Sequence, residues 1–167
     1  GEDPYLAGRM GVAFVRGLQG DDPRYLKLGT TAKHYAVHSG PEPARHRFDA
    51  QSSLRDMRDT YLPAFEALVR EGQTVSVMCA YNRINGDPAC ANEVLLDEFL
   101  RKKWGFAGYV VSDCGAIHDI YQNHKVEPDA AHAAAHAVRA GTDLECDNDA
   151  AYKALPEAVE KQLIDEA

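Results

Sequence analysis

Hydrophobic residues recur every three or four positions in several stretches of the chain, which predicts amphipathic helices. Short runs rich in β-branched and apolar residues stand between them and predict buried strands. We expect helices over residues 5–18, 59–70, 92–103, 116–122, 129–140 and 155–167, and strands over 26–36, 74–79, 109–112 and 141–144. Residues 39–50 contain two prolines and several charges and predict a long irregular loop. Strands that alternate with helices favour right-handed βαβ units, so the predicted fold class is α/β with a parallel sheet of about four strands.

Polar side chains follow the predicted strands at the point where each one ends. They are Lys33 with His34, Tyr81 with Asn82, Asp113, and Asp143. A (β/α)8 barrel collects its chemistry at this rim. The Gly-rich phosphate loop of a doubly wound sheet is not found after any predicted strand, because the glycines at 8 and 11 lie inside a helix. Four strands therefore predict half of a TIM-type barrel.

Composition limits the partners that the chain is expected to bind. Its 167 residues include 18 Lys and Arg against 26 Asp and Glu, a formal net charge of −8. An acidic balance without a basic cluster argues against a nucleic acid or a membrane surface. No run approaches the roughly 18 apolar residues that a membrane-spanning helix needs. The chain opens on a helix-entry signal, in which Asp3 can cap and Pro4 starts the helix, and it ends on helical residues, so we expect an excised segment.

Asp113 is the sharpest chemical candidate. It follows an apolar strand directly, where a carboxylate has no packing role, and a carboxylate there can attack the anomeric carbon of a sugar. The alternative is that Asp113 caps the helix that follows, a role worth about 1 kcal/mol. Spacing alone leaves both interpretations open.

Five motifs in one order resemble glycoside hydrolase family 3. They are GEDPYLAG at the start, KHY at 33–35, VMCAYNRING at 77–86, GYVVSDCGAI at 108–117 and AGTDLEC at 140–146. Members of the family are retaining, exo-acting enzymes, mainly β-glucosidases and β-xylosidases. Their active site lies between an N-terminal (β/α)8 barrel and a following α/β sandwich domain. The resemblance implies that residues 1–167 are the C-terminal half of the barrel domain, without the sandwich.

The motifs also imply roles for individual residues. Asp113 matches the nucleophile, and Lys33 and His34 match the pair that holds hydroxyls of the sugar in the −1 subsite. Met78 and Tyr81 match residues that line this subsite. These residue types suit the task, because Lys33 only donates hydrogen bonds and favours an ionised carboxylate nearby. Plain packing remains the alternative for Met78, and a solvated strand-end charge for Lys33.

The second carboxyl group of a retaining mechanism is expected to come from the sandwich domain and thus from outside this chain. Loop, cap or surface roles suit Glu2, Glu42 and Glu145 better. The β-N-acetylglucosaminidases of the family instead use an Asp-His pair in the loop after the Lys-His strand. The loop here carries His38 and His46 but lacks their Gly-rich run, and its wording, SGPE followed by RHxFD, is closer to bacterial β-xylosidases.

The four cysteines, at positions 79, 90, 114 and 146, allow three pairings, and none has zinc-type spacing. Cys114 and Cys146 both lie just past adjacent strands, so we expect them to be bridged at the rim, with free thiols as the alternative. Such a bridge would crowd the place where glucose carries its hydroxymethyl group and would favour a pentose. Bridges would also favour a periplasmic or secreted location over a reducing compartment.

The sequence therefore predicts part of a retaining exo-glycosidase that removes terminal β-D-xylosyl or β-D-glucosyl residues and needs no cofactor or metal. Its expected partners are a β-linked glycoside and the remainder of its own barrel and sandwich domain. His132 and His136 are one helical turn apart, but a solvated stripe explains them better than zinc. A β-N-acetylglucosaminidase, a non-catalytic carbohydrate-binding half-barrel and a metallohydrolase are the alternatives.

Overall fold

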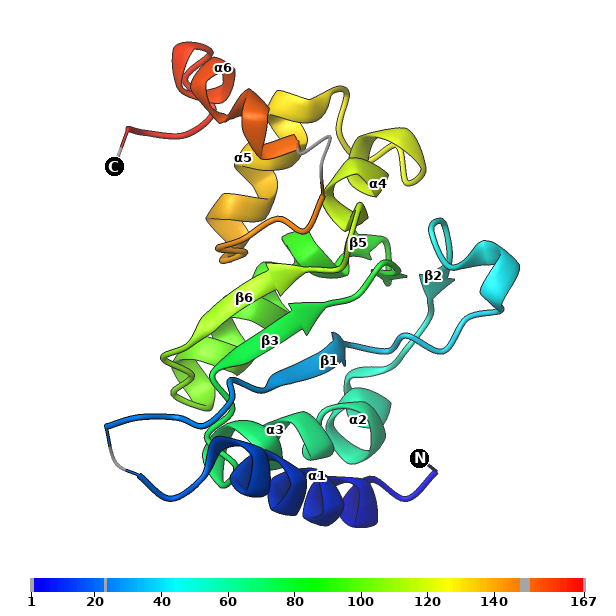
Figure 1. Cartoon of the computed structure of the whole chain (residues 1–167). Coiled ribbons are helices and arrows are strands. Elements are labelled where there is room, and N and C mark those ends of the chain that lie inside the picture. The colour runs from blue at the N-terminus through cyan, green and yellow to red at the C-terminus, as the bar shows by residue number, and fades with distance from the viewer. Residues whose placement is uncertain (1, 23, 148–150, 167) are drawn as a thin grey trace.

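The computed structural model describes residues 2–22, 24–147 and 151–166 (Figure 1). Its helices are α1 (Pro4–Gln19), η1 (Glu42–Ala44), α2 (Leu54–Asp56), η2 (Met57–Tyr61), α3 (Pro63–Arg70), η3 (Ala89–Ala91), η4 (Val94–Lys103), α4 (Ala116–Gln122), α5 (Ala130–Ala140), η5 (Ala151–Ala154) and α6 (Leu155–Glu160). Its strands are β1 (Thr31–Tyr35), β2 (Asp49–Ala50), β3 (Ser76–Cys79), β4 (Arg83–Ile84), β5 (Asp87–Pro88) and β6 (Tyr109–Ser112). The alternation of strands and helices predicted from the sequence is confirmed.

A parallel sheet in the order β1-β3-β6 forms the centre of the molecule. Its strands point the same way, so their carboxyl ends meet at one edge, beside β2, β5 and α4 (Figure 1). Thr31 pairs with Ser76 and Ser76 with Tyr109, which sets the register at the other end. The polar strand-end residues are therefore brought to one side of the molecule, as expected for a parallel α/β fold.

The prediction of a fourth strand over residues 141–144 is wrong. Within this range only Leu144 forms a parallel bridge, to Val111 of β6. Gly141 has a φ of +108°, so the chain turns there and does not enter an extended run. The side chain of Asp143 accepts from the backbone amide of Val110 at 2.7 Å and from Arg101 at 2.6 Å. The amide of Val110 therefore donates to the Asp143 side chain, where a longer fourth strand would have offered a backbone oxygen.

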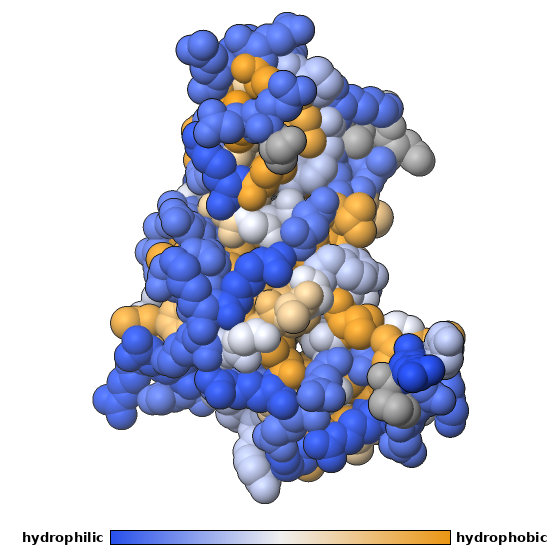
Figure 2. All heavy atoms as spheres, turned by 90° about the vertical axis from the view of Figure 1, so that its left-hand side faces the viewer, coloured by the Kyte–Doolittle hydropathy of each residue, from blue (hydrophilic) through white to orange (hydrophobic). Residues whose placement is uncertain are grey.

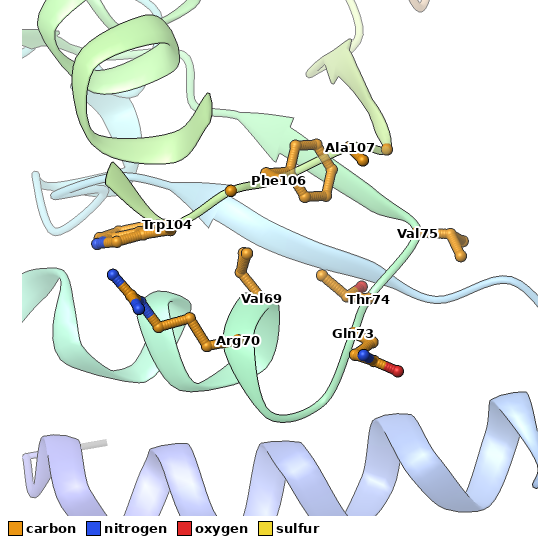
Figure 3. Close-up of a pocket in the computed structure, with 10 residues that line it drawn as sticks. Val69, Arg70, Gln73, Thr74, Val75, Trp104, Phe106 and Ala107 are labelled. Atoms are coloured by element: carbon orange, nitrogen blue, oxygen red, sulfur yellow. The ribbon is translucent and has the colours of Figure 1, made fainter. Parts of the chain in front are cut away.

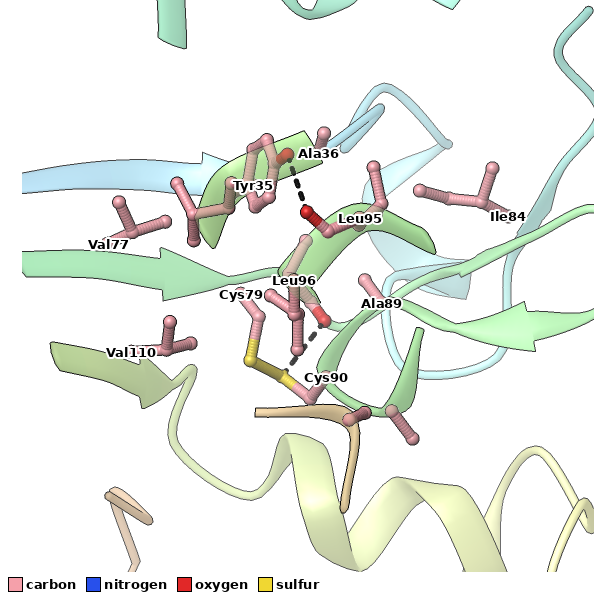
Figure 4. Close-up of a cluster of buried hydrophobic side chains, with 14 of the residues drawn as sticks. Tyr35, Ala36, Val77, Cys79, Ile84, Ala89, Cys90, Leu95, Leu96 and Val110 are labelled. Atoms are coloured by element: carbon pink, nitrogen blue, oxygen red, sulfur yellow. Dashed lines mark hydrogen bonds between the residues drawn. A yellow bond between two sulfur atoms is a disulfide. The ribbon is translucent and has the colours of Figure 1, made fainter. Parts of the chain in front are cut away.

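The main core lies between one face of this sheet and the helices packed on it (Figure 4). Ala32, Val77 and Val110 point to this covered face and are at most 5 % exposed. Leu95 and Leu96 of η4 pack there, and the buried Tyr35 hydroxyl donates to the backbone oxygen of Leu95 at 3.0 Å. This network fixes the end of β1 relative to η4.

The opposite face of the sheet is more open. It carries the exposed Thr31, Lys33 and Tyr109 and the half-buried Met78 and Val111. Seen from the side where the strands begin, the surface is largely hydrophilic, and its hydrophobic residues are spread over several small groups (Figure 2). None of the described helices combines the length and the apolar character needed to cross a membrane.

Helix α1 packs on α3 through its small side chains. A Cβ added to Gly8 would meet that of Ala67 at an ordinary contact distance of 3.4 Å, whereas one added to Gly11 would stand 2.8 Å from a Leu68 methyl group, which would have to move. The periodic apolar stripe that predicted the helix lies elsewhere. The stripe consists of Leu6, Met10, Phe14 and Leu18; the first three are 54–69 % exposed, and Leu18 is half-buried. The helix was predicted correctly from spacing, but tertiary packing selected another face.

The ends of the helices follow local chemistry. Asp3 caps α1 by accepting from the amide of Leu6 at 2.9 Å, with Pro4 at the first position, as predicted. Asn92 accepts from the amide of Leu95 and caps the start of η4, whose turns are of π type. The last helix ends at Glu160 rather than 167, because Gln162 adopts a φ of +57°. The amides of Gln162 and Leu163 donate to the backbone oxygens of Val159 and Ala158 and close the last turn.

Candidate active site

Lys33 and His34 stand at the carboxyl end of β1. The register of β1 against β3 shifts between Lys33 and Tyr35, so His34 has no partner residue in the ladder. Its Nε2 lies 3.3 Å from Oδ2 of Asp113 at the end of β6. Burial lowers the pKa of His34 more than the Asp113 charge raises it, which favours the neutral imidazole. Neutral His34 can donate to one group and accept from another.

Asp113 is placed at the end of β6 by a backbone bond from its amide to Cys79 at 3.1 Å. Its carboxylate is buried, with the residue 7 % exposed. Oδ1 accepts from the amide of Cys114 at 2.9 Å, while Oδ2 accepts no hydrogen bond from any described residue. A buried carboxylate oxygen without a donor requires an explanation, and a binding partner supplied by a substrate is one.

The capping alternative for Asp113 is wrong. The residue that caps α4 is Gly115, with a φ of +87°, and no side chain bonds to that helix start. Glycine is suited to this turn because it adopts positive φ without steric cost. The turn carries the chain from Asp113 into α4 and leaves the carboxylate free of a helical role.

Tyr81 lies between Asp113 and the loop 39–50. It is 7 % exposed, and its hydroxyl donates to the backbone oxygen of Cys114 at 2.9 Å. Burial, followed by the neighbouring Asp113 charge, raises the pKa of Tyr81 to about 12, so its proton is kept at neutral pH. Met78 lies on the open face beside Lys33, its register partner, rather than among the buried core residues. Lys33 is exposed.

The structure adds residues from loop 39–50 that sequence reasoning did not place at the site. The Arg45 guanidinium lies 4.8 Å and the His46 ring 4.4 Å from the centre of the Tyr81 ring. His46 Nδ1 contacts Oδ2 of Asp119 at 2.7 Å, and His38 Nδ1 contacts Asn82 at 3.2 Å. The RHxFD motif of the loop could have pointed to Arg45 and His46 in the sequence, but no spacing rule links this motif to Tyr81 or Asp119.

Both cysteine pairs are bonded. Cys114 and Cys146 have Cα atoms 4.4 Å apart, within the distance that a bridge needs, and the pair joins the residue after Asp113 to the segment beyond Leu144. Cys79 and Cys90 form the second disulfide, inside the hydrophobic core (Figure 4). The first bridge therefore lies at the rim of the site, and the second stabilises the loop after β3.

Two of the three carboxylates set aside in the sequence, Glu42 and Glu145, have other partners. Glu42 pairs with Arg45 at 2.7 Å, and Glu145 accepts from the amides of Ala151 and Tyr152. His132 pairs with Asp129 at 2.8 Å, and His136 Nδ1 lies 2.8 Å from Glu127. Within the ranges that the structure describes, no three His, Cys, Asp or Glu side chains are arranged to hold a metal ion.

Of two hollows in the structure, one is lined by the candidate site residues Lys33 and His34, and the other lies away from them. One of about 460 Å³ is lined by Lys33, His34, His38 and Tyr61 and reaches the end of β1. Another, of about 570 Å³, lies where β3 and β6 begin, between Val69, Trp104 and Phe106 (Figure 3). The second lies at the opposite ends of the strands from Asp113, so it takes no part in the candidate site.

Known proteins resemble the chain over its whole length. A family model described as the glycosyl hydrolase family 3 N terminal domain matches residues 1–167. A xylan 1,4-beta-xylosidase of Xylanibacter ruminicola is 55 % identical over 168 residues, covering 99 % of this chain and 20 % of that protein. The chain thus spans about a fifth of the length of that relative.

Solved structures agree in shape. A GH3 exo-beta-xylosidase (XlnD), in complex with a xylobiose aziridine activity-based probe, superimposes with a TM-score of 0.93 at 35 % identity, over 99 % of this chain and 22 % of that one. A β-glucosidase from Erythrobacter marinus gives a TM-score of 0.91, also at 35 % identity and with the same coverage.

Proposed function

Because the chain belongs to the family described by the glycosyl hydrolase family 3 N terminal domain, we propose that it is the nucleophile-bearing part of a longer retaining β-glycosidase. The relatives that it matches are named xylosidases and glucosidases and are about five times its length. In this proposal residues 1–167 form the C-terminal half of a (β/α)8 barrel. A sandwich domain and the first barrel strands lie outside them.

The observation that carries the proposal is the buried Asp113 carboxylate, whose Oδ2 accepts no hydrogen bond among the described residues although Nε2 of His34 lies 3.3 Å away. Oδ2 attacks the anomeric carbon, the bond to the leaving oxygen breaks, and a covalent glycosyl ester forms. A glutamic acid outside these residues protonates the leaving oxygen and then activates the water that cleaves the ester. Retention follows from two displacements at the same carbon.

The neighbours of Asp113 have matching tasks in this mechanism. Lys33 and His34 hold hydroxyls of the sugar at the non-reducing end, because Lys33 donates hydrogen bonds and the neutral His34 can donate or accept them. The hydroxyl of Tyr81 lies beside Asp113 and is kept protonated by its raised pKa; it donates its proton to the backbone oxygen of Cys114, so toward the sugar it can accept a hydrogen bond. Met78 supplies an apolar contact on the open face of the sheet.

We propose a β-D-xylosyl group as the preferred substrate over β-D-glucosyl. The Cys114–Cys146 disulfide stands directly after the nucleophile. Two bonded sulfur atoms at this rim leave less room for the hydroxymethyl group by which glucose differs from xylose. The identity of 55 % to a named xylan 1,4-beta-xylosidase supports the same choice.

The test uses the full-length enzyme of this proposal and a 2-deoxy-2-fluoro xyloside with a good leaving group. We expect one covalent label, located by peptide mass spectrometry on Asp113, and a larger kcat/KM for aryl xylosides than for aryl glucosides. Asp113→Gly should lose the label and fall in turnover by at least about a thousandfold, the scale of a lost covalent route. Glu42→Gln is the matched control on an exposed carboxylate. A label on another residue would refute the assignment of Asp113, and binding without any label would favour a carbohydrate-binding module.

A further inference from the structure

Loop 39–50, which follows β1, is tied to the helix that follows the nucleophile. His46 Nδ1 lies 2.7 Å from Oδ2 of Asp119, and Asp119 lies in the first turn of α4. The amide of Asp119 donates to Gly115, two residues past Asp113, at 3.0 Å. One His–Asp contact therefore connects the loop after β1 to the helix after β6.

Tyr81 is enclosed by this connection. The His46 ring is 4.4 Å from the Tyr81 ring centre at an interplanar angle of 60°, and the Arg45 guanidinium is 4.8 Å from the same centre. The hydroxyl at the far end of the ring donates to Cys114, the residue after the nucleophile. Rotation of the ring about its side-chain bonds would have to displace His46.

We propose that His46 is a positioning residue, held by Asp119, that fixes the Tyr81 ring so that its hydroxyl stays beside Asp113. The inference rests on the proposed function, since it assigns a role in the attack by that carboxylate. His46 is itself about half exposed, whereas Asp119 has a side-chain exposure of 4 %. Asp119 is thus the buried partner of this contact, and His46 is the loop residue that Asp119 holds.

The burial of Asp119 explains why the contact persists. A buried carboxylate is costly unless it is paired and hydrogen-bonded. Asp119 satisfies this condition with His46 on Oδ2 and with the amide of the Asn123 side chain on Oδ1 at 2.5 Å. If His46 is removed, Oδ2 of Asp119 loses this partner, and loop 39–50 loses the side-chain contact that His46 makes with α4.

The chain offers a matched control. His132 pairs through Nδ1 with Asp129, the N-cap of α5, at 2.8 Å, and the two side chains are 33 % and 43 % exposed. His132 makes no described contact with Tyr81 or Asp113. A comparison of His46→Ala with His132→Ala in the full-length enzyme therefore separates a loss of positioning from a general loss of a His–Asp pair.

The experiment measures the rate at which the 2-deoxy-2-fluoro xyloside labels Asp113, together with kcat and KM for two aryl xylosides. One has a dinitrophenyl and the other a methylphenyl leaving group. We expect His46→Ala to slow labelling about tenfold, a change of about 1.4 kcal/mol. KM should change less than about twofold, because His46 does not contact the sugar in this proposal. His46→Gln, whose amide can donate to Asp119, should recover part of the rate, and His132→Ala should label like the wild type.

Three outcomes would overturn the inference while leaving the proposed function intact. They are wild-type labelling by His46→Ala, an equal loss in His132→Ala, and a loss confined to the methylphenyl substrate. The last would mean that His46 transfers a proton to the leaving group, because an activated leaving group does not need one. Failure of the wild-type enzyme to label at all would count against the proposed function.

Discussion

Removal of the Cys114–Cys146 disulfide tests how the rim of the site is held. The bond closes a loop with a sequence separation of 32, and the Cys79–Cys90 bond closes one of 11. The entropy of the unfolded chain then predicts a loss of about 3.7 kcal/mol for Cys114→Ser with Cys146→Ser, against about 2.8 kcal/mol for the shorter loop. For 167 residues, an unfolding entropy of roughly 2.1 cal/mol/K per residue converts the larger figure into a fall in Tm of about 10 °C.

Burial separates the two bonds in a second assay. Cys114 is exposed, whereas Cys79 and Cys90 are 0 % and 1 % exposed. Thiol–disulfide exchange needs access to a sulfur atom. Mild reduction of the native protein followed by alkylation should therefore label Cys114 and Cys146 first, as peptide mass spectrometry would detect. Earlier labelling of Cys79 and Cys90, or a fall in Tm of less than about 3 °C in the double variant, would refute this reasoning.

Two further predictions concern stability. Gly108→Ala should destabilise the fold by about 2 kcal/mol or more in urea unfolding, because the new Cβ would stand 2.2 Å from the backbone oxygen of Val75. Gly17→Ala in α1 meets nothing within 4 Å and should stabilise the fold by about 0.5–1 kcal/mol; equal effects would contradict the contact argument. Burial lowers the pKa of His124 from 6.5 to about 4. Between these pH values His124 is protonated in the unfolded state but neutral in the folded state, so the free energy of unfolding falls as the pH drops through this range. Between pH 7 and pH 4.5 the loss should be about 2 kcal/mol, and His124→Leu should remove it from the unfolding curves; an unchanged pH dependence would show that His124 is not its source.

The sequence predicted the fold where one local rule was sufficient. The cap at Asp3, the helix that it starts and the parallel strands around Val77 and Val110 follow from hydrogen bonding and periodicity within a few residues. The fourth strand was overestimated because Asp143 takes a hydrogen bond with its side chain, which no propensity encodes. The buried face of α1 was not predictable either, since it is decided by the approach of α3 to Gly8.

For the site, the sequence by itself determined the chemical inventory: a carboxylate after a strand, a Lys-His pair, and a tyrosine in a recognisable motif order. It did so because these groups sit at fixed distances from strands that hydrophobic patterning reveals. Only the tertiary structure decided that Oδ2 of Asp113 lies 3.3 Å from Nε2 of His34 without accepting a hydrogen bond from a described residue, and that His46 reaches Asp119 across 73 positions of the chain. Contacts of that range depend on how strands and loops pack in three dimensions, and no local pattern of side chains specifies them.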